Sequence, residues 1–446
     1  MRSPDAGSRR LLFGKERREL ASSRAWLVLL VLLGPLVGHA FITAVESYAE
    51  VSGAGGGPAA LAQGVSPLDG IVVPTFGAYA IAVTLLFPFV AIRLVSSEKQ
   101  SGALKLLLQA RPSLGTMLLV KLIVLVAAWL LAWLPGLAAL ALWRAYGGHL
   151  AAPEIATVLT GHLLRATLTC AIAIAAAALT DNAATAAVVT LAVTLGTWAL
   201  DFVAQVHGGL ALALDAYTPE SALRTFESGE LRLSLVLVTL VLTAGALLLA
   251  WVWLPPSRTR RQHILWTLPI IVGTGVFVFG AAQLRQSWDL SEDRRNSFAP
   301  ADERALSTVR QPLHISVFLA PEDPRLADLQ RGVFKKLRRT IHDVDISYQG
   351  AGSGLFARPG EHYGEVWYAL GAQRAMNRST TEPIILETIY GLAGISPPAN
   401  DPVSAYSGHP LAVSPRGAAL IFYLGWPTLV IALWWLTRRP RTAKTS

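Results

Sequence analysis

The chain has 446 residues, of which 53% are apolar and only 15% are charged, so a water-soluble globular protein is excluded. Its formal net charge of +9 at pH 7 could suit nucleic acid, but the basic residues gather at the ends of apolar runs, and no nucleic-acid partner is expected. Cys170 is the only cysteine, which excludes an intrachain disulfide and a cysteine metal cluster.

Eight apolar runs dominate the sequence, and each could cross a hydrocarbon core of roughly 30 Å as a helix. We therefore expect a polytopic α-helical membrane protein with about eight transmembrane helices in the lipid bilayer. The predicted spans are residues 25–45, 76–92, 116–142, 156–179, 183–203, 233–254, 263–282 and 417–436. An even number of spans puts both termini on one side, and the flanking basic residues indicate that this side is cytoplasmic.

A basic, amphipathic segment precedes the first span, and residues 1–24 are predicted to form a cytoplasmic N-terminal helix. A cleavable signal peptide is the alternative. We favour an uncleaved anchor because the apolar stretch is long and has no clear small-residue cleavage site. Residues 25–255 then form a membrane domain of six helices.

A charged segment, RLVSSEKQSGALKLLLQARPSLGTMLLVKL, separates the second and third spans. Ser97 followed by Gln100 fits a capping box, and Leu104 and Leu107 belong to one apolar helical face. Pro112 ends the pattern. The segment predicts a short cytoplasmic helix at residues 97–111. An ordinary surface helix in a cytoplasmic loop would carry the same spacing.

Two intramembrane cations need an explanation, since a charge at the centre of a span costs about 2.5–3.5 kcal/mol. Lys121 lies about one turn inside its span, where we expect its ammonium group to reach the interface. Arg165 lies about two turns inside the fourth span. It is a candidate pathway residue for an anionic substrate, and the alternative is a snorkelling or interhelical partner.

Residues 285–416 have the composition of a soluble domain, held outside the membrane between the last two spans. Strands are predicted at residues 313–320, 345–349 and 365–370, and a closing helix at 383–390. Asp323-Pro324 starts another helix, whose buried face is predicted from three- and four-residue steps. That face comprises Leu326, Leu329, Val333, Leu337 and Ile341. The order βαββα predicts a small extracytoplasmic α/β domain. Residues 256–284 hold the seventh helix and its flank, and 417–446 hold the eighth helix and a basic cytoplasmic tail.

The charged segment, the preceding basic helix and the order of the first six spans resemble the permeases of type-2 ABC exporters (GldF-like). In that family this loop is a coupling helix that sits in a groove of a separate ATPase. The resemblance therefore implies an ABC ATPase partner, which carries the ATP and Mg, and a second permease copy or a related permease. The matching residues are Glu98, Lys99, Gly102, Leu104, Leu107, Arg111, Pro112 and Ser113.

The outer domain resembles a second family. RRNSFAPADERALSTVRQPLHISVFLAPEDPR, the following helix, DVDISYQ and a hairpin near EVWYALGAQRAM look like the start of the auxiliary component of gliding-motility-type ABC systems (GldG-like). The chain thus resembles a fusion of permease and auxiliary component. This implies a bacterial inner (plasma) membrane and an extracytoplasmic envelope partner.

The sequence lacks the motifs that would supply chemistry within the chain. No GxxxxGK[ST] phosphate loop, HExxH zinc motif or nucleophile elbow occurs. We expect no cofactor and no catalytic site in this chain, with ATP hydrolysis on a separate subunit. The expected function is that of an exporter permease. The alternative is a non-transporting envelope scaffold that transmits ATPase-driven movement to an extracytoplasmic partner.

Overall fold

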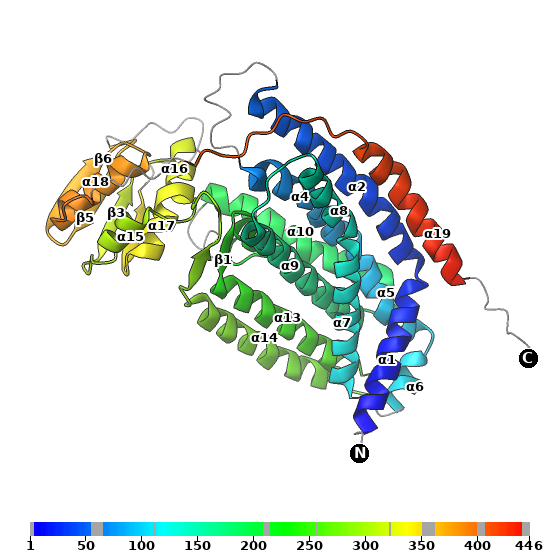
Figure 1. Ribbon diagram of the computed structural model, residues 1–446. Helices are drawn as coiled ribbons and strands as arrows, with labels where there is room; N and C mark the ends of the chain where they lie inside the picture. The colour runs from blue at the N-terminus through cyan, green and yellow to red at the C-terminus, as the bar shows by residue number, and fades with distance from the viewer. Residues whose placement is uncertain are drawn as a thin grey trace, which may run out of the picture.

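Long helices make up most of the structure, and a small sheet domain stands at one end of them (Figure 1). The computed structural model describes residues 4–54, 66–109, 113–207, 215–255, 257–320, 323–349, 362–398 and 406–438. We call the end of the bundle that carries α1 (Pro4–Ala21) and α6 (Ala103–Gln109) the α6 end. The opposite end, next to the sheet domain, is the domain end.

Seven helices among the described residues are long and apolar enough to cross a membrane, which indicates a multi-pass membrane protein. They cover Arg24–Gly53, Leu68–Gln100, Leu114–Ala145, Ala152–Leu179, Ala183–Leu200, Leu233–Trp253 and Arg260–Ala282. Their elements are α2 (Arg24–Ala49), η1 (Glu50–Ala54), η2 (Leu68–Val72), α4 (Val73–Leu85), α5 (Phe87–Gln100), α7 (Leu114–Ala132), α8 (Leu134–Ala145), α9 (Ala152–Leu179), α10 (Ala183–His207), α13 (Leu233–Trp253) and α14 (Arg260–Ala282).

The predicted eighth span is a shorter apolar helix, made of η4 (Leu420–Gly425) and α19 (Trp426–Arg438). It lies along α2 (Figure 1). Gly34 and Gly38 permit this close approach, since a Cβ on either would come within 2.2 Å of Trp426 or Phe422. The indole of Trp426 also donates to the Leu30 carbonyl at 2.7 Å. Its crossing of the membrane stays a prediction.

The third long helix bends where α7 meets α8, because a hydroxyl is inserted into its hydrogen-bond ladder. The fully buried Tyr79 donates to the Ala132 carbonyl at 2.9 Å and accepts from the Gly136 amide at 2.9 Å. Pro135 lies between them and has no N–H to give. The bend therefore leaves no polar backbone group unpaired at these two positions.

The sheet domain is built on a four-stranded mixed sheet with the order β4-β3-β5-β6. Its strands are β3 (Leu313–Val317), β4 (Val344–Tyr348), β5 (Val366–Leu370) and β6 (Gln373–Asn377). Strand β3 runs parallel to β4 and antiparallel to β5, and β6 completes a hairpin with β5. This confirms a small sheet region where three strands and a hairpin were predicted.

Helices cover the sheet, namely α15 (Pro300–Leu306), α16 (Pro324–Leu329), η3 (Gln330–Phe334), α17 (Lys335–Thr340) and α18 (Glu382–Ala393). The apolar face predicted from Leu326 to Ile341 lies on the segment between β3 and β4. All five of its residues are buried, which confirms that prediction. The Asp323 carboxylate accepts the Arg325 amide at 3.0 Å and so serves the predicted helix start. The hydrogen bond from Arg325 lowers the pKa of this carboxyl to about 2.

A two-stranded sheet joins the long helices to the sheet domain. The sequence did not predict it. Strand β1 (Glu230–Arg232) lies just before α13, and β2 (Ser287–Asp289) lies just after α14. They pair antiparallel, with Glu230 opposite Asp289. Helix α12 (Pro219–Glu227) precedes β1 and packs against α9.

Candidate functional site

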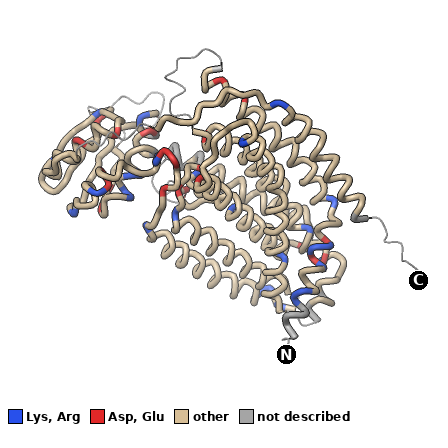
Figure 2. The backbone as a smooth tube through the Cα atoms, in the orientation of Figure 1, with Lys and Arg blue, Asp and Glu red and all other residues tan. Residues whose placement is uncertain are grey.

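Charged residues gather near the two ends of the bundle and are sparse between them (Figure 2). The α6 end holds the segment predicted to couple the chain to an ATPase. Helix α5 ends at Gln100, and the chain turns at Gly102, whose φ of +75° favours glycine. Helix α6 follows, and Ser113 caps α7 by accepting the Thr116 amide at 3.2 Å.

The predicted helix start at Ser97 is wrong. Ser97 lies inside the last turn of α5, and its hydroxyl donates to the Glu19 carboxylate of α1 at 2.8 Å instead of capping a helix. The coupling segment predicted at residues 97–111 therefore contains the end of α5, a turn and the short helix α6. Arg111 and Pro112 lie outside the described residues.

The leucines of α6 face in different directions. Leu104 is 5% exposed and belongs to the core of the bundle, and Leu107 packs partly against that core. Leu106, in contrast, is 68% exposed at the end of the molecule. The apolar face predicted from Leu104 and Leu107 thus faces inward at these two residues, and Leu106 is a large apolar side chain that α6 presents outward.

Lys121 does not reach for the interface as predicted. Its side chain is fully buried, and its ammonium group contacts Glu16 of α1 at 2.9 Å and Glu98 of α5 at 3.0 Å. It also donates to the Leu94 carbonyl at 2.8 Å. Three helices are therefore joined through one ammonium group on α7. The Glu98 carboxylate, expected to serve an ATPase contact, is buried in this cluster.

Lys15 completes the cluster by pairing with Glu98 and with Glu19, the latter at 3.4 Å. Burial raises the pKa of the Glu16 carboxyl. Burial opposes the charge of Lys15, but its hydrogen bond to Glu98 and the surrounding carboxylates raise its pKa overall. The oxygens of Glu16, Glu19 and Glu98 lie within 4.8 Å of one another, but Lys15 and Lys121 already pair with them, so we interpret this group as an ion-pair cluster rather than a metal centre.

Lys99 is also engaged inside the chain. Its ammonium group donates to the carbonyls of Ala177, Ala178 and Thr180, at 3.2, 3.0 and 2.6 Å. These carbonyls end α9 and have no partner within the helix. A cation at this position also interacts favourably with the negative, C-terminal end of the α9 helix dipole. Lys99 therefore fastens the end of α5 to the end of α9.

Arg165 lies in the interior of the bundle, with a side chain 12% exposed. Its guanidinium pairs with Glu220 of α12 at 2.7 Å and donates to the Thr84 hydroxyl of α4 at 3.0 Å. Two turns along α12, Glu227 lies 3.3 Å from the buried His162. The geometry matches the interhelical alternative for Arg165, and a role in a substrate pathway stays a proposal.

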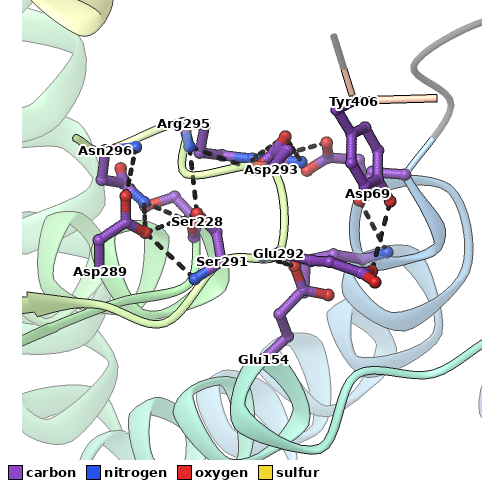
Figure 3. A network of polar contacts seen from close by, with 12 residues as sticks. Asp69, Glu154, Ser228, Asp289, Ser291, Glu292, Asp293, Arg295, Asn296 and Tyr406 are labelled. Carbon is purple, nitrogen blue, oxygen red and sulfur yellow. Dashed lines mark hydrogen bonds and ion pairs between the residues drawn. The ribbon is translucent and has the colours of Figure 1, made fainter. Parts of the chain in front are cut away.

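At the domain end, Asp289 is the centre of a hydrogen-bond network (Figure 3). Its carboxylate accepts from the hydroxyls of Ser291 and Ser297 at 2.5 and 2.6 Å, and from the Asn296 amide at 3.0 Å. These bonds outweigh the cost of burial and lower its pKa. Glu230 behaves alike, since Arg232 and Lys335 overcome burial and lower its pKa. The network ties β1, β2 and α17 together.

Two further contacts attach the linker after β2 to the membrane helices. Glu154 at the start of α9 accepts the Glu292 amide at 2.7 Å, and Arg295 pairs with Asp69 before α4 (Figure 3). Neither contact could be read from the sequence, because the partners lie more than a hundred residues apart. The sheet domain is thereby held against α9 and η2.

A cleft of about 660 Å³ opens between α2 and the start of α4 at the domain end. Its volume lies within the range of small-molecule sites. Apolar residues make up much of its wall, and its polar side chains include His39, Ser47, Tyr48 and Asp69. Arg165 does not line it. The cleft adds a second candidate place for a substrate, away from the predicted one.

Comparisons with family models, curated proteins and solved structures found no match. The geometry described above is therefore the basis for a functional conclusion.

Proposed function

We propose that this chain is the permease subunit of an ATP-driven ABC transporter, an exporter, and that α6 docks into a separate ATPase. The observation that carries the proposal is the exposed Leu106 on a short helix in which Leu104 is buried in the bundle and Leu107 packs partly against it. An isolated apolar side chain on such a helix fits insertion into a pocket of a partner. The α6 end is then cytoplasmic, in the inner membrane.

The connections of α6 support a role in transmitting movement. Gly102 separates α6 from α5 by a single turn, and Leu104 packs into the bundle. The Lys121 cluster holds the ends of α5 and α7 to α1, and Lys99 holds α5 to α9. A displacement of α6 by the ATPase would therefore move four helices together and shift the bundle between inward- and outward-facing states.

The remaining parts receive roles that follow from this proposal. A second copy, or a related permease, would cover the apolar surface of α10 or α14, whose membrane segments are largely exposed in the single chain. Arg165 and the 660 Å³ cleft are the candidate contacts for the substrate, Arg165 for an anionic group. The sheet domain would meet an extracytoplasmic envelope partner.

The test is retention of an ATPase by the tagged chain, purified in mild detergent from its own host. Wild type should retain a protein with a GxxxxGK[ST] motif, and Leu106→Asp should retain at least about tenfold less of it. Ser257→Asp adds the same charge to an exposed turn between α13 and α14 and should retain the wild-type amount. Leu104→Asp is unsuitable as the test, because it places a charge in the core.

If the wild-type chain stays intact in detergent but retains no such ATPase, the result would count against the permease proposal. Equal retention by the Leu106→Asp and Ser257→Asp variants would move the docking site away from α6. The scaffold alternative is favoured by the several ties between the sheet domain and the bundle. Stimulation of ATP turnover by a transported substrate in liposomes would distinguish transport from scaffolding.

A further inference from the structure

Three metal-binding side chains from distant parts of the chain meet at the domain end. His149 lies in the turn between α8 and α9, and Glu292 lies in the linker after β2. His409 lies in the segment that leads back to η4. One ligand atom from each lies within 4.8 Å of the other two. The site is separate from both α6 and Arg165, and the proposed transport function does not use it.

The spacing of the three ligand atoms is close to that of a metal site. The Nε2 atoms of both histidines lie 3.2 Å from the same Oε1 of Glu292. Ligand atoms of a tetrahedral Zn²⁺, with bonds of about 2.0–2.2 Å, lie about 3.3–3.5 Å apart. The two rings are stacked with centroids 3.7 Å apart and an interplanar angle of 16°. One ring therefore has to turn before the in-plane lone pairs of both Nε2 atoms point at the same ion.

The Nε2 atom of His149 makes no hydrogen bond to the described residues, although it lies 3.2 Å from Oε1 of Glu292. Nε2 of His409 does form a hydrogen-bond contact with Glu292, at 3.2 Å. A metal ion bound to Nε2 of His149 would give this nitrogen a directed partner.

The bundle holds the backbone of all three residues in place. The indole of the buried Trp143 donates to the His149 carbonyl at 2.9 Å, and the Tyr48 hydroxyl donates to the His409 carbonyl at 2.7 Å. The buried Glu154 accepts the Glu292 amide at 2.7 Å. Such supporting bonds orient the ligands of metal sites. The three side chains themselves are each about one-third exposed, so an ion and a chelator can reach them.

We propose that His149, Glu292 and His409 form a binding site for a divalent first-row transition metal, with Zn²⁺ as the fitting ion and water in the fourth position. Bound metal would fasten the return segment to α9 and to the linker after β2. Its role would be to hold the outer domain in one position on the bundle.

The test uses the full chain with an affinity tag that contains no histidine, freed of metal by EDTA and titrated with Co²⁺. Wild type should bind about one Co²⁺ per chain, with the visible absorption of a tetrahedral site, and Zn²⁺ should displace it. His149→Ala and His409→Ala should each weaken binding at least tenfold. His314→Ala is the matched control, because His314 is an exposed histidine that pairs only with Asp345 among the described residues. This variant should bind like wild type.

A second readout guards against variants that fail to fold. Labelling of the buried Cys170, the only cysteine of the chain, follows thermal unfolding of each protein. Zn²⁺ should raise the unfolding temperature of wild type by a few degrees and should not raise that of Glu292→Gln. Absence of saturable Co²⁺ binding in wild type overturns the proposal. So does binding that is unchanged in all three ligand variants.

Discussion

At the α6 end, charged side chains of α1, α5 and α7 meet in the interior of the bundle, and Lys121 and Glu16 are both fully buried. At the domain end, Asp289 of β2 is held by hydroxyl and amide donors that lie close to it in sequence, and Glu230 of β1 pairs with Arg232 and Lys335. The first arrangement joins distant helices through ion pairs. The second shapes the linker after β2 and leaves the edge of that linker accessible to solvent.

This difference bears on what each end can do. Buried opposite charges hold each other strongly when both are present, but the loss of either one leaves the other uncompensated. A loop network built from several hydrogen bonds loses them one at a time. We therefore expect the α6 end to move as one body and the domain end to tolerate local change.

The largest effect should come from Lys121. Lys121→Met leaves the buried carboxylates of Glu16 and Glu98 facing each other, with only the peripheral Lys15 near them. We expect a loss of about 3–5 kcal/mol in the free energy of unfolding, measured by Cys170 labelling during thermal denaturation. The double variant Lys121→Met/Glu16→Met should recover much of the loss. If the single variant unfolds like wild type, the ion pairs do not hold the α6 end together.

A smaller loss is expected at the centre of the other network. Asp289→Ala leaves the hydroxyls and amides around it without an acceptor, which should cost about 1–3 kcal/mol. Hydrogen exchange should increase in β1 and β2 but not in α5 or α7. Asp345→Ala, an exposed aspartate of the sheet domain, should change stability by less than about 0.5 kcal/mol. An increase that spreads to the α6 end would erase the proposed contrast.

Lys99 should have a more modest effect, because it serves the end of a single helix. Lys99→Met removes the cation from the final carbonyls of α9 and should cost about 1 kcal/mol. Exchange of the amides in the last turn of α9 should report it. Lys99→Arg keeps a cation there and should behave more like wild type. Equal behaviour of both variants would mean that the carbonyls find other donors.

The smallest effect is a difference in pH dependence between the two ends. The pKa values of Asp289 and Glu230 are lowered in the folded chain, so the stability they provide is present above their ordinary values near 4 and is lost as pH falls through the lowered values. The pKa of Glu16 is raised, so its contribution is largest below its ordinary value of 4.5 and falls as pH rises through the raised value.

Hydrogen exchange between about pH 6 and pH 3, corrected for its intrinsic pH dependence, tests this contrast. Protection of β1 and β2 should fall at the acidic limit, while protection of α1 should hold or increase as Glu16 takes up its proton. Parallel loss of protection at both ends would contradict the opposite signs.

Sequence reasoning worked where the signal is local. Seven of the eight predicted spans follow from hydropathy alone, and the buried face from Leu326 to Ile341 follows from helical spacing. The strands of the outer domain were located for the same reason. Each of these predictions depends on a pattern within one continuous stretch of sequence.

Contacts between distant residues could not be predicted. Glu16 precedes its partner Lys121 by 105 positions, so Lys121 looked like a residue that reaches for the interface. Ser97 and Gln100 fit a capping pattern, yet the apolar run of α5 continues through them and Glu19 takes the hydroxyl. Strands of three residues, such as β1 and β2, carry too little pattern to be recognised.

The sheet domain is inserted between α14 and η4, so the chain enters and leaves it through different helices. Helix α14 packs against α13, and α19 packs against α2, on opposite sides of the bundle (Figure 1). The domain thereby connects the α13–α14 pair on one side of the bundle to the α2–α19 pair on the other. A change in the separation or tilt of these two helix pairs would therefore act on the domain through both of its chain connections.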